Sequence, residues 1–314
     1  MLTTLSIQIA LDPYITSLGG VTISWLGVFI VLGIFLGGWL AFRLAFTSRV
    51  NLDPDQAYNL MPVVVASGIV GARLLFVVER YGDSSSLDSP LEIFAITEGG
   101  ISIYGSLIGG AVGGWAYGLW KRLPRAATAD AAAMGMLLGI AVGRVGDVIN
   151  GEHLSRASNL PWAVIYTHPN SPSYMQGTQH PVVAYEIVGA LAVLGLLFLL
   201  LQRSPKPGVV FASAFLGYAV MRFFISFLRV DSKEPLIGLS TPQVVSILVF
   251  LVALSLLIYF VRRPPAQSPQ AGPSRSAMRF SEDQESLQRD STSSLSKSQA
   301  SGRQAEGPRE GASC

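Results

Sequence analysis

The chain has 314 residues, of which 50% are hydrophobic and 13% are charged, and its formal net charge is +2. Hydrophobic content this high with so few charges suits an integral membrane protein better than a soluble domain, and the near-neutral charge gives no sign of nucleic-acid binding. The single cysteine, Cys314, is the last residue, so neither an internal disulfide nor a cysteine nucleophile within the fold is expected.

Seven mostly apolar runs are each about 20 residues long, enough to cross the hydrocarbon core of a bilayer. They cover residues 20–43, 58–79, 100–120, 129–148, 182–202, 208–228 and 241–261. The N-terminus lacks the basic region of a secretory signal, so the first run is expected to remain as a span. Glycines near positions 37, 109 and 113 are expected to permit close helix packing. The sequence therefore predicts an all-α integral membrane protein, a polytopic bundle of about seven transmembrane helices.

The basic residues of the connections are unevenly distributed between the two sides of the predicted bundle. Those that follow the odd-numbered spans are Arg43, Arg49, Lys121, Arg122, Arg125, Arg203, Lys206, Arg262 and Arg263. The other connections hold fewer basic residues, and several of these stand beside acidic ones. Since basic loops stay in the cytoplasm, we predict an N-terminus outside the membrane and a C-terminus in the cytoplasm.

Two segments differ from the spans. Residues 149–181 form a long outside loop with several prolines, predicted to make a small cap over the helices. Its three histidines are His153, His168 and His180. Residues 264–314 are rich in Pro, Ser, Gln and Gly, and they cannot bury enough apolar surface to offset their ordering entropy. We therefore divide the chain into a transmembrane domain, 1–263, and a disordered cytoplasmic tail, 264–314.

With this topology, polar side chains of five spans and the adjoining loop fall at one depth near the outer boundary. They are Arg73, Tyr104, Arg144, Asp147, Glu152, His180, Tyr185, Glu186, Tyr218 and Arg222. A charge at membrane depth is costly and usually marks a functional site. Simpler interpretations exist for single residues: a lone arginine reaches to the headgroups, and Arg144 and Asp147, three apart, neutralise each other. These interpretations leave the shared depth unexplained.

The residue types at this depth suit phosphate binding. Arginines with tyrosines and a histidine hold a phosphate through charge-assisted hydrogen bonds while acyl chains stay in lipid, so a phospholipid headgroup is the expected ligand. A metal site is not expected, because there is no H-E-x-x-H motif and the histidines are separated along one loop. A membrane serine protease would need a partner for Ser106 that nothing marks, and a transporter would place polar groups near the bilayer midplane.

Six motifs occur in the order and spacing of one known family. They are "GGISIYGSLIGG" (99–110), "GRVGDVINGE" (143–152), "LPWAVIY" (160–166), "HPVVAYE" (180–186), "YAVMRFFISFLRVDS" (218–232) and "GLSTPQ" (238–243). Through them, residues 15–262 resemble the prolipoprotein diacylglyceryl transferases. The tail lies outside the resemblance.

The resemblance implies an enzyme of the bacterial inner membrane that moves the diacylglyceryl group of phosphatidylglycerol onto the lipobox cysteine of a prolipoprotein, forming a thioether and releasing glycerol phosphate. The implied partners are phosphatidylglycerol, membrane lipid and prolipoprotein signal peptides, with no cofactor and no metal. Together, the resemblance and the shared depth make Arg222, Tyr104, Tyr218 and His180 the candidate catalytic residues. They make Arg144, Asp147, Asn150, Glu152, Glu186 and Arg73 the candidate substrate-binding residues.

The chain departs from the family pattern at several positions. Tyr104 stands where a histidine is common, so either another group, such as His180 or Glu186, activates the substrate thiol, or the tyrosine only positions the lipid. The other departures are at Leu26, Asp147, Ser155 and Ser226. A second hypothesis is therefore a membrane protein that has the fold of this family and binds phospholipid or lipoprotein precursors without catalysing transfer.

Asp147 stands where the family usually has asparagine. An ionised Asp147 beside Arg144 would compete with the phosphate for the guanidinium group. Two arrangements relieve this conflict: Asp147 pairs with another cation, such as Arg73, or it carries a proton. We expect the first, since arginines outnumber acids at this depth.

Overall fold

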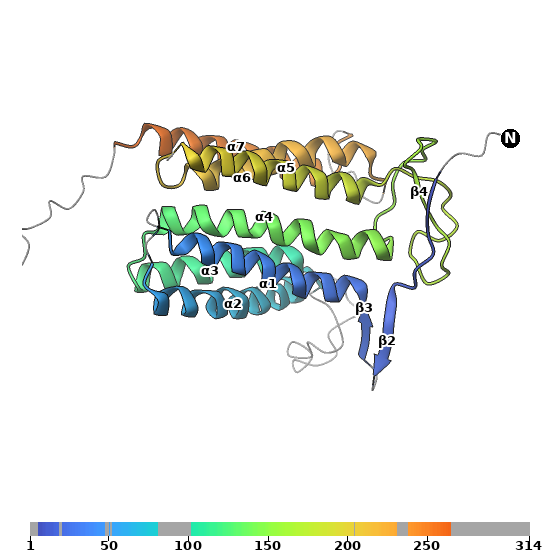
Figure 1. Ribbon diagram of the computed structural model, residues 1–314, viewed down its shortest axis with the longest axis horizontal. Helices are drawn as coiled ribbons and strands as arrows, with labels where there is room; N and C mark the ends of the chain where they lie inside the picture. Colours follow the sequence, from blue (N-terminus) through green and yellow to red (C-terminus); the bar gives the residue numbers. More distant parts are fainter. Residues whose placement is uncertain are drawn as a thin grey trace, which may run out of the picture. The chain divides into compact units, whose positions relative to one another are not determined.

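The computed structural model describes residues 6–18, 21–47, 50, 52–80, 102–203, 205–230 and 238–264 (Figure 1). Its helices are α1 (Trp25–Ala45), α2 (Pro54–Arg80), α3 (Ile103–Trp120), α4 (Arg125–Asn150), α5 (Val182–Gln202), α6 (Val209–Ile225), the 3₁₀ turn η3 (Ser226–Leu228) and α7 (Thr241–Arg262). Within the described ranges, six of the seven α-helices, all except α3, are long and apolar enough to cross a membrane. The predicted all-α, polytopic membrane architecture is confirmed. The predicted tail lies, from residue 265 on, outside the described residues.

Local capping decides where the helices begin. The Ser24 side chain accepts a hydrogen bond from the Gly27 N–H at 3.1 Å and starts α1, whereas Val21–Ser24 form strand β3. The predicted first span, which starts at residue 20, therefore begins too early, because hydropathy does not separate a short apolar strand from the helix that follows it. Helix α7 begins at a capping box in which Ser240 and Gln243 bond each other reciprocally.

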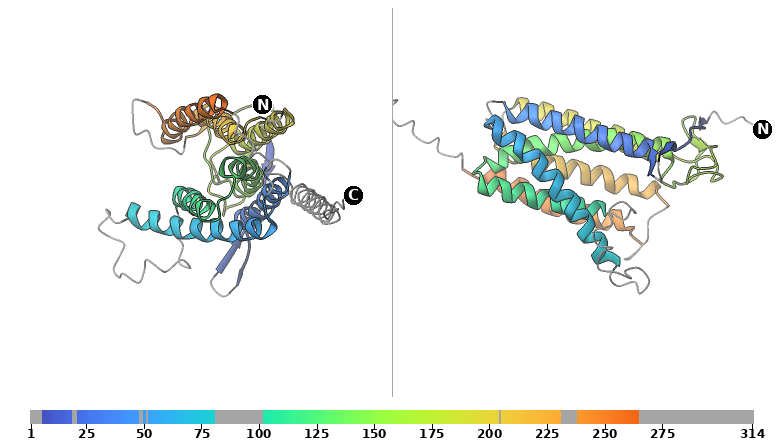
Figure 2. Two further views of the ribbon diagram at one scale, coloured as in Figure 1. Left: turned by 90° about the vertical axis from the view of Figure 1, so that its left-hand side faces the viewer. Right: turned by 90° about the horizontal axis from the view of Figure 1, so that it is seen from below.

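Helix α4 lies at the centre of the bundle, where it packs against α1, α3, α5 and α6 (Figures 1 and 2). Its contact with α1 is close because glycines face each other: a Cβ on Gly37 would lie 2.5 Å from the carbonyl oxygen of Gly135. Helices α2 and α3 approach in the same way, with Gly109 against Gly71. The prediction that these glycines serve close packing is confirmed.

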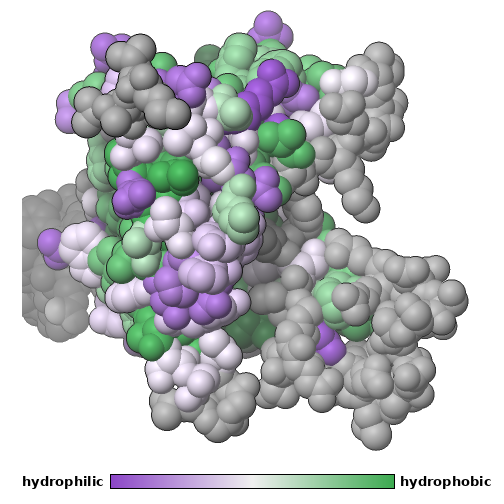
Figure 3. All heavy atoms as spheres, turned by 90° about the vertical axis from the view of Figure 1, so that its right-hand side faces the viewer, coloured by the Kyte–Doolittle hydropathy of each residue, from purple (hydrophilic) through white to green (hydrophobic). Residues whose placement is uncertain are grey.

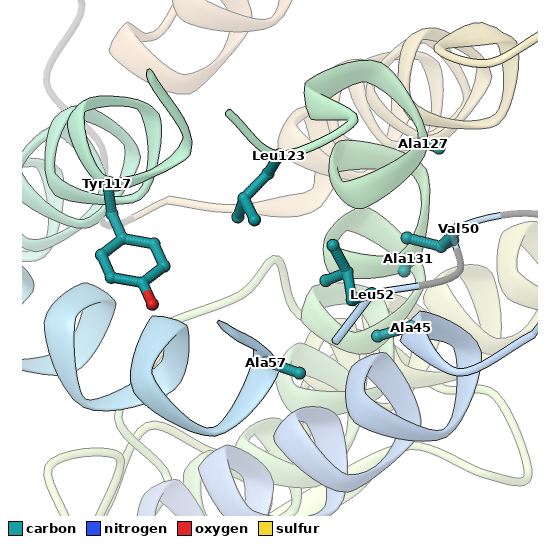
Figure 4. Close-up of a cluster of buried hydrophobic side chains, with 8 residues drawn as sticks. All are labelled: Ala45, Val50, Leu52, Ala57, Tyr117, Leu123, Ala127 and Ala131. Carbon is teal, nitrogen blue, oxygen red and sulfur yellow. The ribbon is translucent and has the colours of Figure 1, made fainter. Parts of the chain in front are cut away.

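Two clusters of buried apolar side chains hold the helices together. The first joins the ends of α1 and α3 to the starts of α2 and α4, and consists of Ala45, Val50, Leu52, Ala57, Tyr117, Leu123, Ala127 and Ala131 (Figure 4). The second joins α4, α5 and α6, and consists of Ala133, Met134, Leu137, Leu194, Leu197, Val210 and Ala214. Elsewhere large apolar side chains point outward, as suits helices surrounded by lipid; Phe35 is 66% exposed and Trp120 is 73% exposed.

The residues between α4 and α5 form the predicted cap at one end of the bundle (Figure 1). Strand β4 (Val164–Tyr166) pairs in parallel with β1 (Ile7–Ile9), which brings the N-terminal segment onto the cap. The chain turns into the cap at Gly151, whose left-handed backbone (φ 73°) ends α4; a Cβ there would lie 2.8 Å from the ring of Tyr166. Strand β2 (Tyr14–Leu18) pairs with β3 in an antiparallel hairpin. Seen from this end, the surface mixes hydrophilic and apolar side chains (Figure 3).

At the other end of α4, a buried carboxylate fixes this helix to α6. Asp130 is 2% exposed and accepts hydrogen bonds from the backbone N–H groups of Gly208, at 2.9 Å, and Phe211, at 2.7 Å. These amides belong to the start of α6, where a helix has no carbonyl of its own to satisfy them. The carboxylate therefore caps α6, and its charge suits the positive end of the helix dipole. This contact holds the start of α6 against α4.

Candidate functional site

Glu186, near the start of α5, is a carboxylate that is only 1% exposed. Three arginines neutralise it. Arg222 hydrogen-bonds Oε1, Arg229 Nη1 lies 3.4 Å from the same oxygen, and Arg144 Nε lies 2.9 Å from Oε2. A buried carboxylate that lost such partners would destabilise the fold by several kcal/mol, so these contacts are needed for Glu186 to occupy its position.

The fold brings the three arginines together from separate elements. Arg144 lies near the C-terminal end of α4, Arg222 in the last turn of α6, and Arg229 directly after η3. Arg229 has extended backbone beyond the helical turns, and its side chain reaches the same carboxylate as that of Arg222. The segment after η3 is held by the cap, since the carbonyl of Leu228 accepts a hydrogen bond from the Arg156 N–H at 2.9 Å.

His153 from the cap and Asp147 from α4 complete the group. Arg144 Nη1 lies 2.7 Å from Asp147 Oδ2 and 2.9 Å from His153 Nε2. On the opposite side of the imidazole ring, His153 Nδ1 lies 2.8 Å from Arg229 Nη2. The distance from Asp147 Oδ2 to His153 Nε2 is 4.0 Å. We call these residues the arginine cluster: Arg144, Asp147, His153, Glu186, Arg222 and Arg229.

The arginine cluster carries more positive than negative charge. Among the residues that the structure describes, three guanidinium groups of the cluster face two carboxylates. The side chains of Arg144 and Arg222 are 20% and 16% exposed, against 6% for Arg229, so the first two can reach a ligand. In the described part of the chain, no group of three or more His, Cys, Asp or Glu side chains is arranged to hold a metal ion. The arrangement suits a singly charged anion.

One turn after Asp147, Asn150 presents an acceptor suited to a ligand hydroxyl. Asn150 is 3% exposed, and its amide nitrogen donates to Glu152 Oε1 at 3.2 Å. Its Oδ1 is buried and has no hydrogen-bond partner among the described residues. Exchanging the amide nitrogen and oxygen would set two acceptors against each other, so the contact with Glu152 fixes the orientation. Oδ1 is thus available to accept a hydrogen bond from a ligand.

Three further residues predicted for the site do not belong to the arginine cluster. Tyr218, one turn before Arg222 on α6, packs against the apolar cluster of α4, α5 and α6. Arg73 on α2 is 9% exposed, and its guanidinium carbon lies 5.2 Å from the centre of the Phe76 ring. Tyr104 belongs to the first turn of α3, and its side chain lies outside the described residues.

His180 lies at a small cavity beneath the cap, which His153 and Tyr166 also line. Its Nδ1 is buried and has no hydrogen-bond partner in the described ranges, and its ring centre lies 6.3 Å from that of Tyr185. Burial and the Asp147 carboxylate raise the pKa of Tyr166 to about 12, so its hydroxyl stays protonated and donates to the Val148 carbonyl at 2.8 Å. The cavity thus brings His180 close to the arginine cluster, where its role stays a prediction.

The expected pairing of Asp147 with a cation other than Arg144 is wrong. Its carboxylate lies 2.7 Å from Arg144 Nη1, in a salt bridge between residues three apart. Side chains at this spacing meet on one face of a helix, so the nearest guanidinium group captures the carboxylate. An anion that bound Arg144 would therefore compete with Asp147 for this guanidinium group.

Two members of the arginine cluster, His153 and Arg229, were not predicted from the sequence. The sequence held a signal for each. Arg229 belongs to the same motif as Arg222, and His153 directly follows Glu152, the last residue of the motif that contains Arg144. A pattern of this kind shows that a residue is near the site without showing which partner it contacts.

The chain is similar to proteins described as prolipoprotein diacylglyceryl transferases. The sequence model of the family described as prolipoprotein diacylglyceryl transferase matches residues 13–259. A phosphatidylglycerol–prolipoprotein diacylglyceryl transferase of Dehalococcoides mccartyi is 32% identical over 257 residues, which cover 82% of this chain and 96% of that protein. Proteins of the same name are 35% identical in Thermosynechococcus vestitus, covering 76% of this chain and 87% of theirs, and 34% identical in Enterococcus faecalis, covering 78% and 89%.

Proposed function

The chain belongs to the prolipoprotein diacylglyceryl transferase family, and from this premise we propose that it transfers the diacylglyceryl group of phosphatidylglycerol to the lipobox cysteine thiol of a prolipoprotein. The reaction forms a thioether and releases glycerol phosphate. The single cysteine of the chain is Cys314, at the end of the predicted tail, so the thiol that attacks belongs to the substrate.

The observation that carries the proposal is the charge of the arginine cluster. Among the described residues its three guanidinium groups outnumber its two carboxylates, and the phosphodiester of phosphatidylglycerol carries one negative charge. Arg144 and Arg222, the more exposed arginines, are the proposed phosphate ligands. Arg229, more deeply buried, would stay on Glu186 and keep that carboxylate neutralised.

The same arginines would assist the chemical step. The thiolate sulfur attacks the glycerol carbon that bears the phosphate, the carbon–oxygen bond breaks, and the electron pair stays on the phosphate oxygen. The charge of the phosphate thus grows from about one toward about two negative charges. Guanidinium groups already in contact with the phosphate stabilise this transition state more than the bound lipid, which is the condition for catalysis.

The other predicted residues would bind the remainder of the substrates. Asn150 Oδ1 and the Glu152 carboxylate are acceptors, and the headgroup of phosphatidylglycerol offers hydroxyl donors. Tyr218 and Arg73 would line the path of the lipid, and His180 or Tyr104 remain proposed for activating or positioning the thiol.

The membrane orientation supports access for both substrates. The positive-inside pattern places the N-terminus outside and the C-terminus in the cytoplasm of the bacterial inner membrane. In that orientation the cap and the arginine cluster lie at the outer face, where the lipobox cysteine of an exported precursor arrives.

The binding-only alternative is not favoured, because the similar proteins named above are described as transferases. A decisive experiment is complementation of a bacterial strain depleted of its own transferase, combined with mass spectrometry of a lipobox peptide. Wild type is expected to restore growth and to add a diacylglyceryl group to the peptide, and Arg222→Ala to do neither.

The matched control is Arg203→Ala, which removes an exposed arginine that follows α5 at the end opposite the cap and should behave as wild type. A wild-type protein that inserts normally but leaves the peptide unmodified would favour the binding-only alternative.

A further inference from the structure

Asn150, the last residue of α4, has a buried acceptor. The residue is 3% exposed, and its Oδ1 has no hydrogen-bond partner in the part of the chain that the structure describes. A buried carbonyl oxygen that no donor satisfies destabilises a fold, and such atoms are uncommon in proteins. The position of Oδ1 therefore indicates a donor that comes from a bound molecule.

The Asn150 side chain is held in place without a ligand. Its Nδ2 donates to Glu152 Oε1 at 3.2 Å, which fixes the end of the amide that accepts. The backbone around it is bonded to the cap: the Asn150 carbonyl accepts from Ser171 Oγ at 2.8 Å, and the Gly151 carbonyl accepts from Ser173 Oγ at 2.7 Å. Because the acceptor is already oriented, a ligand that donates to it loses little binding free energy to ordering of the site.

The neighbouring Glu152 carboxylate is a second acceptor. It is exposed, and one amide hydrogen uses only part of the capacity of its two oxygens. Two neighbouring acceptors repel a phosphate oxygen and bind hydrogen-bond donors. A hydroxyl is favoured over an ammonium group, because bringing a positive charge to the buried Oδ1 costs more free energy than burying a hydroxyl. The pair therefore suits a ligand with two hydroxyls.

Asn150 lies beside the groups that hold the proposed phosphate. Arg144, Asp147 and Asn150 follow one another at intervals of three on α4, and Asp147 contacts Arg144. Side chains at this interval are neighbours on the helix surface, about 5–6 Å apart. A headgroup that extends from a phosphate on Arg144 toward the end of α4 therefore brings its hydroxyls to Asn150 and Glu152.

We propose that Asn150 and Glu152 select the headgroup of the lipid substrate by accepting hydrogen bonds from its two hydroxyls. The inference rests on the proposed function, because it takes phosphatidylglycerol as the ligand. Asn150 Oδ1 accepts from one hydroxyl and the Glu152 carboxylate from the other, while Arg144 and Arg222 hold the phosphate. A headgroup without hydroxyls leaves the buried Oδ1 unsatisfied, and a site built to bind a hydroxyl rejects such an analogue more strongly than an apolar pocket does.

The test pairs a change in the protein with a change in the lipid. Phosphatidylpropanol has the three-carbon headgroup and the single negative charge of phosphatidylglycerol but no headgroup hydroxyl. Transfer from each lipid, in mixed micelles, to a lipobox peptide gives a ratio of kcat/KM values for wild type, Asn150→Ala, Asn150→Leu and Glu152→Gln. Leucine fills the volume of asparagine without an acceptor. The matched control is Asn170→Ala, which removes a cap asparagine whose Nδ2 donates to a different carboxylate, that of Asp12, at 3.1 Å.

Wild type is expected to prefer phosphatidylglycerol by at least about tenfold in kcat/KM. In Asn150→Ala and Asn150→Leu this preference should fall to within about twofold of unity, because kcat/KM falls for phosphatidylglycerol and is kept for phosphatidylpropanol. Glu152→Gln should lower the preference about threefold, since an amide oxygen accepts less strongly than a carboxylate. Asn170→Ala should match wild type.

An equal loss with both lipids in a folded Asn150 variant would show that Oδ1 serves the fold or an ordered water, and the inference would fail. It would also fail if wild type used both lipids equally. An unchanged preference in Glu152→Gln would remove that carboxylate from headgroup recognition. The unfolding temperature shows which variants are folded; if neither Asn150 variant is, Glu152→Gln decides.

Competition of the two lipids for the protein in native mass spectrometry separates this inference from the proposed function, because binding needs no transfer. A preference for bound phosphatidylglycerol that depends on Asn150 is the expected result. The same preference in a wild-type protein that transfers nothing would overturn the proposed function and leave the headgroup site standing.

Discussion

Helix α4 contributes to two buried carboxylate sites, one near each end, and they are neutralised in different ways. Asp130, 2% exposed, accepts two backbone N–H groups from the start of α6. Glu186, 1% exposed, is paired with arginine side chains, one of them Arg144 of α4. Backbone amides cannot move without unwinding the helix, whereas a guanidinium group on a flexible side chain can turn from a carboxylate to a phosphate.

The difference separates a structural site from the proposed functional one. At Asp130 the two backbone partners are fixed, so the carboxylate contributes to stability. At Glu186 the partners are long side chains, and two of them, Arg144 and Arg222, are partly exposed. Burial of a charged side chain in an apolar bundle therefore does not by itself indicate function. The two sites differ in whether the partners of the buried charge can move.

The largest effect is expected from removing the exposed arginines of the arginine cluster. Arg144→Ala and Arg222→Ala should each abolish measurable transfer, a loss of at least about 10²-fold, because each removes a charged contact to the departing phosphate. Lysine at either site should restore activity only partly, since it lacks the guanidinium fork. Transfer to a lipobox peptide by purified, folded protein measures this, and a near wild-type rate in either alanine variant would exclude that arginine from the mechanism.

At the opposite end, Asp130→Ala should act on stability rather than on transfer. It leaves two buried N–H groups unpaired, at about 1–3 kcal/mol each, so the unfolding temperature in detergent should fall clearly. At temperatures where the variant is folded, its transfer rate should lie within about twofold of wild type, because the free energy lost belongs to the fold. Loss of transfer with an unchanged unfolding temperature would show that the two ends of α4 are coupled functionally.

A smaller effect is expected at Asp147, the carboxylate that shares Arg144 with the phosphate. Asp147→Asn removes the competing charge while keeping a polar side chain, so transfer at neutral pH should be equal to or a little faster than that of wild type. Rates measured from neutral to mildly alkaline pH for both proteins provide the comparison. A large loss would show instead that the carboxylate is required, and Asp147 would become a candidate for the base.

No effect on transfer is expected from truncation after Arg263. The composition of residues 264–314 predicts a segment without a packed core on the side of the membrane opposite the proposed site. The measurement is the transfer rate of the truncated protein, together with a topology reporter fused after residue 263, which should read as cytoplasmic. A stably expressed but inactive truncation would assign the tail a role in assembly or regulation, and a periplasmic reporter would reverse the proposed orientation.

Much of the fold could be predicted from the sequence, because a transmembrane helix is a local property. The predicted fifth span coincides with α5, Val182–Gln202, and the predicted seventh span differs from α7, Thr241–Arg262, by one residue. The first span was placed too early because Val21–Ser24, apolar enough to extend it, pair in a strand instead. A strand this short is stable only when it pairs with another strand, and its hydropathy does not distinguish it from the start of a helix.

The candidate site was predictable only in part. The shared depth of Arg144, Glu186 and Arg222 follows from the position of each residue in its own span, and the structure brings these three into contact. Arg229 and His153 were not predicted because their contacts are with residues far away in the sequence. Arg229 contacts a carboxylate 43 residues earlier, and His153 contacts an arginine 76 residues later.

The sequence by itself predicted most of the helices, a shared depth for the polar residues, and the family, because apolar length and motif spacing are read along the chain. The tertiary structure decided which polar groups meet. That choice depends on how each helix is rotated about its axis, and the rotation is set by long-range contacts such as Gly37 against Gly135 and Asp130 on the start of α6. Because a helix buried in lipid is apolar on most faces, its hydropathy does not reveal that rotation, and so the Glu186 contacts with three arginines emerge only from the packed bundle.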